Sequence, residues 1–337
     1  MKVAVVGASG YAGAELLRLL ASHPEADVVL ATGESARGRR VADHTPALAA
    51  LYPTTVLGSL DELPALDIDV AFLALPHGRS QDLVGDLLER GVQVVDLGAD
   101  YRLRDAEDYR EWYGDAHRDP ARLSQAVYSL VERHRSEIVG SRFLAVPGCY
   151  PTATSLALGP FLDEGVVDTT GLVVNALSGV SGAGRSPSDR LHFPRLAGNA
   201  EPYGLLRHRH TIEIEREIGA EVLFTPHLIP VARGMLVSAY ARVSGDLDTE
   251  SAIDILRERY HDEPFVVVSD EPPALKDTVG SNLCMVSARV DERTGWLVVM
   301  SALDNLVKGA AGQAVQAWNV SRGIAEGTAL PRAGVTP

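Results

Sequence analysis

Three glycines, Gly7, Gly10 and Gly13, follow an apolar run at Lys2–Val6 and lead into a leucine-rich stretch, Ala14–Ala21. Gly7 and Gly10 permit a tight turn and a close backbone approach to a diphosphate, and Gly13 permits a helix to pack closely on the strand. The helix N-terminus adds unpaired N–H groups and the positive end of its dipole. This context predicts a dinucleotide-binding turn, although the spacing is G-x-x-G-x-x-G instead of the commoner G-x-G-x-x-G.

The rest of the first half continues this alternation of strands and helices. Its apolar runs lack polar alternation, which is typical of parallel strands covered on both faces. Because helical segments separate the runs, we expect a Rossmann-like domain with a parallel α/β sheet. Further strands are expected at Val28–Ala31, Val70–Leu75 and Val92–Asp96, and a further helix at Ser80–Arg90.

The pattern changes near Pro147–Cys149, after which strand candidates follow one another with fewer helices between them. Leu236–Val243 and Leu283–Val290 alternate partly between apolar and polar residues, as antiparallel strands with one covered face do. We therefore expect two domains: residues 1–148 with 305–337, and residues 149–304 as an α+β domain with a mostly antiparallel sheet. The other elements expected there are strands at Leu172–Ala176, Val222–Pro226, Phe265–Val268 and Trp296–Ser301, and helices at Thr211–Ile218, Thr249–Tyr260 and Asp304–Val320.

Composition excludes several classes of protein. A net charge of −14 disfavours nucleic-acid binding, because phosphate backbones select basic surfaces. The sequence has no run of roughly 18 apolar residues, so no membrane span is expected. The N-terminus enters a strand-and-turn pattern at once and lacks the features of a signal peptide, so a cytoplasmic location is expected. Two cysteines in 337 residues provide neither a disulfide framework nor a metal cluster, and no metal is expected.

The segment after the second expected strand bears on the choice of dinucleotide. NAD sites usually place an acidic residue here to bind the ribose hydroxyls, and Glu34 is available. Ser35, Arg37, Arg39 and Arg40 are also present, and arginines suit a 2′-phosphate. The residues favour NADP, while Glu34 keeps NAD open.

Cys149 occupies the position most suggestive of chemistry. A strand ends near Val146, Pro147-Gly148 turns the chain, and Pro151 suits the first turn of a new helix. A thiol just ahead of a helix N-terminus has a lowered pKa, because the partial positive charge there favours the thiolate. Cys284 lies within a strand pattern and is interpreted as a core residue.

Several longer motifs resemble the N-acetyl-γ-glutamyl-phosphate reductase family in order and composition, from residue 3 to about residue 320. The resemblance implies NADPH-dependent reduction of a small acyl phosphate through a thioester on Cys149, in arginine biosynthesis. It also implies a homo-oligomer, a dimer or tetramer, assembled through the sheet of the second domain. The motifs that carry it are Gly7–Gly13, Val146–Thr152, Ser178–Arg185, His208–Thr211, Phe224–Pro230 and Asp304–Gly309.

The resemblance also assigns roles to individual residues. It implies that Cys149 and His210 are catalytic, although the residues alone leave His208 and His210 open to interpretation as surface histidines. Asn175, Leu177 and Ile212 depart from the residues common in the family. The implied cofactor-binding residues are Gly7, Ser9, Gly10, Tyr11, Ala12, Gly13, Ser35, Arg37, Pro76, His77, Ser181, Gly182, Ala183 and Asn305, and the implied substrate-binding residues are Arg102, Ser178, Arg185, His208 and His227.

Three alternative functions remain open at this point. The chain also has the organisation expected of an aspartate-semialdehyde dehydrogenase. Within the resembling family, the substrate could carry a carrier protein or a longer aminoadipyl chain in place of the N-acetyl group. A non-enzymatic alternative is an NADP-binding redox sensor that uses Cys149 as a switch, for which Cys284 would be the sole resolving thiol.

Overall fold

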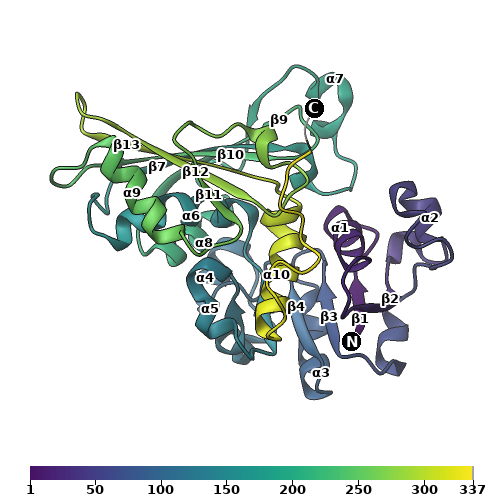
Figure 1. Cartoon of the computed structure of the whole chain (residues 1–337). Helices are drawn as coiled ribbons and strands as arrows, with labels where there is room; N and C mark the ends of the chain where they lie inside the picture. Colours follow the sequence, from purple (N-terminus) through teal and green to yellow (C-terminus); the bar gives the residue numbers. More distant parts are fainter. Residues whose placement is uncertain (336–337) are drawn as a thin grey trace. The chain divides into compact units, whose positions relative to one another are not determined.

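A computed structural model of the chain describes residues 1–335, which form two compact units (Figure 1). Unit 1 comprises Met1–Pro147 and Ala310–Leu330, and unit 2 comprises Gly148–Gly309 and the described residues from Pro331 on. The sequence-based division assigned all of 305–337 to the first domain, whereas 305–309 and the described residues after 330 group with unit 2. No helix among the described residues is long and apolar enough to cross a membrane.

Unit 1 is built on a parallel sheet with the strand order β2-β1-β3-β4-β6-β5. Each neighbouring pair in this sheet is parallel, and β1 lies between β2 and β3. Val3, Val5 and Val6 of β1 are fully buried, as expected for a strand covered on both faces. The predicted parallel sheet is confirmed. Its strands are β1 (Lys2–Val6), β2 (Asp27–Ala31), β3 (Val70–Leu73), β4 (Gln93–Asp96), β5 (Val127–Tyr128) and β6 (Phe143–Ala145).

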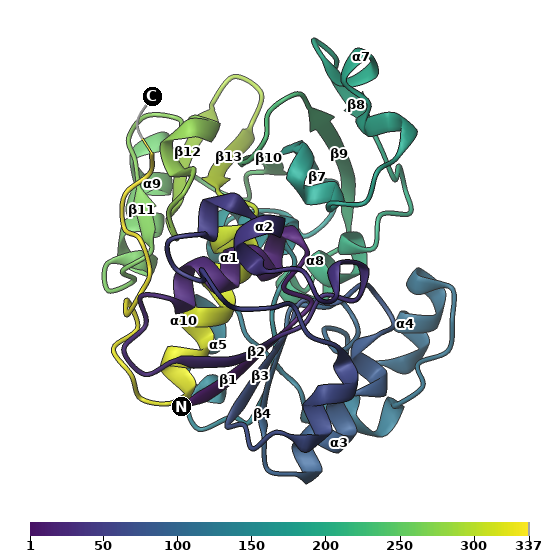
Figure 2. The same cartoon turned by 90° about the vertical axis from the view of Figure 1, so that its right-hand side faces the viewer.

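Helices cover both faces of this sheet (Figure 2). Phe72 of β3 contacts Trp318 of α10 on one face, with ring centroids 5.5 Å apart. The next residue, Leu73, points to the other face and joins a core that includes Leu87 of α3. The helices of unit 1 are α1 (Tyr11–Leu20), α2 (Val41–His44), α3 (Val84–Glu89), α4 (Ala106–Tyr113), α5 (Val131–Ile138) and α10 (Gly312–Ser321).

Unit 2 contains a mixed, mostly antiparallel sheet with the strand order β11-β12-β13-β10-β7-β9-β8, as predicted. Among the described residues, only the pairs β7–β9 and β11–β12 are parallel. The strands are β7 (Leu172–Gly179), β8 (Glu201–Pro202), β9 (Val222–Ile229), β10 (Met235–Arg242), β11 (Val266–Val268), β12 (Cys284–Asp291) and β13 (Trp296–Leu303).

Helices α6 (Cys149–Asp163), α8 (His210–Ile218) and α9 (Thr249–Tyr260) lie on one side of this sheet, and α7 (Phe193–Leu196) belongs to the excursion between β7 and β8 (Figure 1). Met235, Val237 and Ala239 of β10 are fully buried, while Leu236 and Tyr240 alternate onto the opposite, half-buried face. This alternation indicates that the helices cover one face and leave the other more open.

The segment after β13 differs from the predicted helix at Asp304–Val320. Val307–Ala311 forms a π-helix, and the α-helix begins only at Gly312. The Asp304 carboxylate accepts hydrogen bonds from the Leu306 and Val307 amides, and the Gly309 amide donates to the Asp304 carbonyl. Side-chain capping of this kind competes with regular α-helical bonding, which explains the delayed start of α10.

Candidate active site

Cys149 is the first residue of α6 and is partly exposed. Gly148 precedes it in an extended conformation, with φ −70° and ψ 157°, and no side chain caps this helix start. Most of α6 is buried and it packs against α8, β10 and β13, so its position is fixed by the core of unit 2. The structure thus places Cys149 at the helix start predicted for it, whereas Cys284 is fully buried in β12, as predicted.

Glu213 connects the two predicted catalytic residues. Its side chain is 1% exposed, and its Oε1 accepts a hydrogen bond of 2.7 Å from the amide of Gly148, directly before Cys149. Its Oε2 lies 4.0 Å from Nε2 of His210. Sequence analysis missed Glu213, although a carboxylate three residues after a histidine on one helix shares its face.

His208 supports the site from the side. Its Nδ1 accepts a hydrogen bond of 3.1 Å from the amide of His210, and its ring packs edge-on against Tyr150 and Phe224. Burial, together with the charge of Arg209, lowers the pKa of His208 to about 4. His208 is therefore neutral near pH 7, with its proton on Nε2, and orients the start of α8.

A tyrosine pair lies beside these histidines. The hydroxyls of Tyr150 and Tyr203 are 2.7 Å apart, and burial raises the pKa of Tyr203 to about 12. Tyr150 follows Cys149 directly and is itself buried, with its ring 5.7 Å from that of His210. Both hydroxyls therefore stay protonated at neutral pH and can act as neutral hydrogen-bond donors or acceptors.

The second glycine-rich loop is joined to Asn305. Asn305 Nδ2 donates to Ser181 Oγ at 2.9 Å, and Asn305 Oδ1 accepts from the Gly234 amide at 2.8 Å. Ser178 is buried, and a Cβ on Gly182 would lie 3.0 Å from its Oγ, so the loop folds closely over the end of β7. The structure thus brings together the sequence-predicted Ser178, Ser181, Gly182 and Asn305, while Ala183 and Arg185 are exposed farther along the chain.

His227 lies on a different face of the sheet from this cluster. Phe224 of β9 points toward Tyr150 and His208. Three residues later on the same strand, His227 points to the opposite face of the sheet. It neighbours Leu177 of β7, and Asn175 alternates onto the same face. The family departures at Asn175 and Leu177 therefore lie away from Cys149, and Ile212 is a buried residue of α8.

The first glycine-rich turn in unit 1 has the close backbone packing that a dinucleotide site needs. Gly7 has φ +90°, and a Cβ there would lie 2.3 Å from the Ala74 carbonyl oxygen. A Cβ on Gly13 would lie 2.2 Å from the carbonyl oxygen of Gly7, so strand and helix approach as the motif predicts. Gly10 precedes α1 without a side-chain cap, and Tyr11 and Ala12 open that helix. The residues present fit a diphosphate group.

The residues after β2 fit a 2′-phosphorylated ribose better than an unmodified one. Glu34, the acidic residue that would suit NAD, has its Oε1 bonded to the Leu60 amide at 2.9 Å. Ser35 and Arg37 are exposed beside it, and Arg37 Nη1 lies 3.8 Å from an Asp61 oxygen. Arg40 instead forms a two-bond ion pair with Asp43.

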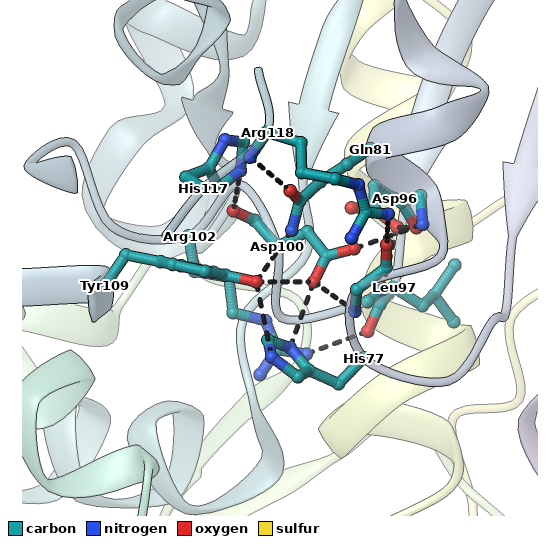
Figure 3. Close-up of polar contacts among 12 residues, drawn as sticks. His77, Gln81, Asp96, Leu97, Asp100, Arg102, Tyr109, His117 and Arg118 are labelled. Carbon is teal, nitrogen blue, oxygen red and sulfur yellow. Dashed lines mark hydrogen bonds and ion pairs between the residues drawn. The ribbon is translucent and has the colours of Figure 1, made fainter. Parts of the chain in front are cut away.

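Pro76 and His77 belong to the loop after β3, and Arg102 belongs to the loop after β4. Figure 3 shows His77 and Arg102. His77 Nδ1 lies 3.0 Å from Oδ1 of Asp100, a fully buried carboxylate that sequence analysis missed. Arg102 donates from Nη2 to the Leu97 carbonyl at 2.8 Å, and Pro76 is exposed. These loops are at the carboxyl ends of parallel strands, where ligands bind in open α/β sheets.

The chain belongs to the class of semialdehyde dehydrogenases, because family models of that class match both of its halves. Residues 2–141 match the family described as semialdehyde dehydrogenase, NAD binding domain, and residues 149–305 match semialdehyde dehydrogenase, dimerisation domain. The fold is similar to that of aspartate semialdehyde dehydrogenase II from Vibrio cholerae, at a TM-score of 0.71 and 18% identity, covering 95% of this chain and 97% of that one.

The chain belongs to the N-acetyl-gamma-glutamyl-phosphate reductase family. It is 44% identical to the protein of that name from Symbiobacterium thermophilum, covering 99% of this chain and 98% of that protein. The protein of the same name from Desulforamulus reducens is also 44% identical, and each chain is covered completely. The relative from Magnetococcus marinus is 42% identical, with 98% and 97% covered.

Proposed function

We propose that this protein is an oxidoreductase that reduces N-acetyl-γ-glutamyl phosphate to N-acetylglutamate semialdehyde with NADPH, in arginine biosynthesis. The observation that carries the proposal is 44% identity over the full length to proteins of that name. The cluster of Cys149, His210 and Glu213 supports it, because it combines a nucleophile with a candidate acid–base group.

In the first step, Sγ of Cys149 attacks the acyl carbon of the substrate as a thiolate. The C–S bond forms as the bond to the phosphate oxygen breaks, so inorganic phosphate leaves and a thioester remains on Cys149. The uncapped start of α6 favours this chemistry, since the positive end of the helix dipole stabilises negative charge near the sulfur.

When bound, NADPH supplies the hydride that reduces the thioester carbon. The resulting thiohemiacetal on Cys149 then collapses: the C–S bond breaks, the oxygen forms the aldehyde carbonyl, and the sulfur leaves as thiolate. We assign the accompanying proton transfers to His210. Glu213 orients that imidazole and stabilises its protonated form, as a third group often does for a catalytic base.

Residues of unit 1 are proposed to bind the dinucleotide. The backbone of Gly7–Gly13, including Ser9, Tyr11 and Ala12, would contact the diphosphate, and Ser35 and Arg37 the 2′-phosphate. Pro76 and His77 lie on the loop after β3, at the edge of the sheet where such ligands bind. The contacts predicted for Ser181, Gly182, Ala183 and Asn305 with the cofactor, and for Arg102, Ser178, Arg185 and His227 with the substrate, stay predictions.

We further propose a cytoplasmic homo-oligomer, a dimer or tetramer, that associates through the open face of the unit 2 sheet. Leu223 on this face is 51% exposed, and Leu177, Leu236, Tyr240 and Val298 are half-buried there. Exposed apolar side chains that gather on one face of a sheet are typical of a protein interface. Light scattering on the wild type and a Leu223→Glu variant tests it: a monomeric wild type contradicts the proposal, and the variant should dissociate.

Substrate choice is tested by running the reaction in reverse. N-acetylglutamate semialdehyde, aspartate semialdehyde and the semialdehyde of N-acetyl-aminoadipate are each incubated with NADP and phosphate, and NADPH formation is followed. We expect NADPH to form with N-acetylglutamate semialdehyde, and only when phosphate is present. Faster NADPH formation with either of the other two semialdehydes would show that the substrate is a different acyl phosphate, while the type of reaction would stay as proposed.

The nucleophile is tested with Cys149→Ser and, as the matched control, Cys284→Ser. We expect Cys149→Ser to lose nearly all activity and to form no covalent acyl adduct, while Cys284→Ser retains both. An active Cys149→Ser variant would contradict the thioester mechanism and favour the redox-sensor alternative.

A further inference from the structure

The loop after β3, Pro76–Ser80, lies beside a cavity. His77 and Gly78 line a cavity of about 420 Å³ that Tyr109 and Arg118 also line. Gly78 has φ +84°, a left-handed conformation in which the chain reverses. Apart from the His77 ring, the loop gains few apolar contacts on the side of the cavity, so its backbone conformation depends largely on hydrogen bonds.

Asp100, on the loop after β4, accepts two of those bonds (Figure 3), and Arg118 donates a further one to the Gly78 carbonyl at 2.5 Å. Its Oδ1 accepts from the Gly78 amide at 2.7 Å, and its Oδ2 accepts from the Ser80 amide at 3.1 Å. The same Oδ1 lies 3.0 Å from His77 Nδ1. One carboxylate that is fully buried therefore contacts three of the five residues of the loop.

Asp100 is the ionised member of a buried pair of carboxylates. Burial raises its pKa, but His77 and the two loop amides outweigh that effect and bring the pKa below its ordinary value. The neighbouring Asp96 has its pKa raised to about 7 by burial, and it accepts a hydrogen bond from the Ser80 hydroxyl at 2.7 Å. Unequal surroundings thus keep Asp100 charged, which makes its bonds to the loop charge-assisted.

The same carboxylate binds an aromatic residue that contacts the loop. Its Oδ1 accepts from the Tyr109 hydroxyl at 3.3 Å, and that hydroxyl lies 3.2 Å from Nε2 of His77. The His77 ring also stacks on Tyr113, with centroids 4.6 Å apart. The His77 side chain is therefore held within unit 1, and what the loop can offer a ligand is its backbone.

We propose that Asp100 is a positioning residue that fixes the loop Pro76–Ser80 in the conformation that binds NADPH, without touching the reacting atoms. The inference rests on the proposed function, because it assumes that this loop contacts the dinucleotide. It adds a role for a buried carboxylate that the thioester chemistry does not use.

The test compares Asp100→Asn with Asp119→Asn. In the variant an NH2 group replaces one of the two carboxylate oxygens, so either the Gly78 or the Ser80 amide faces a donor and loses its bond. Asp119 is the matched control, since its carboxylate lies in the same region but accepts from Tyr101 and Arg122 instead of from the loop. Binding of NADPH is measured by fluorescence titration, and steady-state kinetics are measured in parallel.

For Asp100→Asn we expect the Kd for NADPH to rise at least roughly tenfold, corresponding to the loss of one or two charge-assisted bonds. The KM for the acyl substrate and kcat at saturating NADPH should stay within about twofold of wild type, because no reacting group is removed.

A measurement on the wild type keeps the proposal testable if Asp100→Asn does not fold. The Gly78 and Ser80 amides should exchange slowly with deuterium before NADPH is added, because the carboxylate already binds them. Fast exchange there, an unchanged Kd in Asp100→Asn, or an equal loss in Asp119→Asn would each overturn the positioning role. A wild-type protein that binds no NADPH would instead overturn the proposed function.

Discussion

Gly309 lies against Cys149 so closely that a Cβ on the glycine would be 2.7 Å from the Cβ of the cysteine. The same added atom would lie 3.2 Å from Cδ1 of Leu303, so a side chain at position 309 would be crowded from two sides. Gly309 belongs to the π-helix Val307–Ala311, a type of segment often found at functional sites. The missing side chain at position 309 is therefore part of what sets the position of the sulfur.

A Gly309→Ala variant should accordingly displace Cys149 and lower kcat/KM by roughly a hundredfold, the scale of a 1 Å misplacement of a reacting group. Steady-state kinetics measure the loss. Gly85→Ala is the matched control, because its Cβ would meet only the flexible end of Arg122, at 3.1 Å. A Gly309→Ala enzyme with wild-type kinetics would show that the close approach has no catalytic consequence.

Glu213→Gln retains an oxygen that can accept from the Gly148 amide but removes the negative charge near His210. We expect kcat to fall by about tenfold or more, since a general acid–base group then lacks its charged partner. Glu215→Gln is the control on the same helix, where the carboxylate accepts from the Val222 amide. Equal losses in the two variants would argue for a general effect on α8.

Replacing His208 should change how stability depends on pH. The ordinary histidine pKa of 6.5 is lowered to about 4 in the folded chain, so the unfolded chain takes up this proton first. Stability is therefore lost as pH falls from about 6.5 to about 4, by up to a few kcal/mol.

His208→Asn removes this loss of stability at low pH, because an asparagine side chain does not titrate. The asparagine Oδ1 can still accept the hydrogen bond from the His210 amide. Asp96 has the opposite effect on the pH dependence. Because its pKa is raised in the folded chain, its contribution to the free energy of unfolding declines as pH rises from 3.8 to about 7. Asp96 is unchanged in the variant, so the difference between the two proteins isolates His208. Urea unfolding at several pH values gives the free energy of unfolding of both proteins. As pH falls, the wild type should lose more of this free energy than the variant. A difference between the two that does not change with pH would contradict the role assigned to His208.

Arg37→Ala should weaken NADPH binding selectively. Loss of a charge-assisted contact to the 2′-phosphate predicts a KM for NADPH about tenfold higher, with KM for NADH unchanged. Arg104→Ala is the control, since Arg104 is an exposed arginine paired with Glu137 on another part of unit 1. An equal rise of the KM for NADPH and for NADH would show that Arg37 does not contact the 2′-phosphate.

The features that could be predicted from the sequence are those carried by neighbouring residues. Glycine spacing identified the turn between β1 and α1, and strand periodicity located β10 and β12 to within one residue at each end. The helix at Thr249–Tyr260 also begins and ends where predicted. Backbone preferences and side-chain periodicity act over a few residues, so a linear reading detects them.

The sequence by itself thus determined the two types of sheet, the glycine turn and a cysteine at the start of a helix. Only the tertiary structure decided that Glu213 reaches Gly148, 65 residues earlier, that Asp100 bonds to a loop 20 residues before it, and that His227 faces away from Cys149. These relationships depend on strand register and on how helices pack against the sheet. Both are set by contacts between residues distant in the chain, which leave no local periodicity to detect.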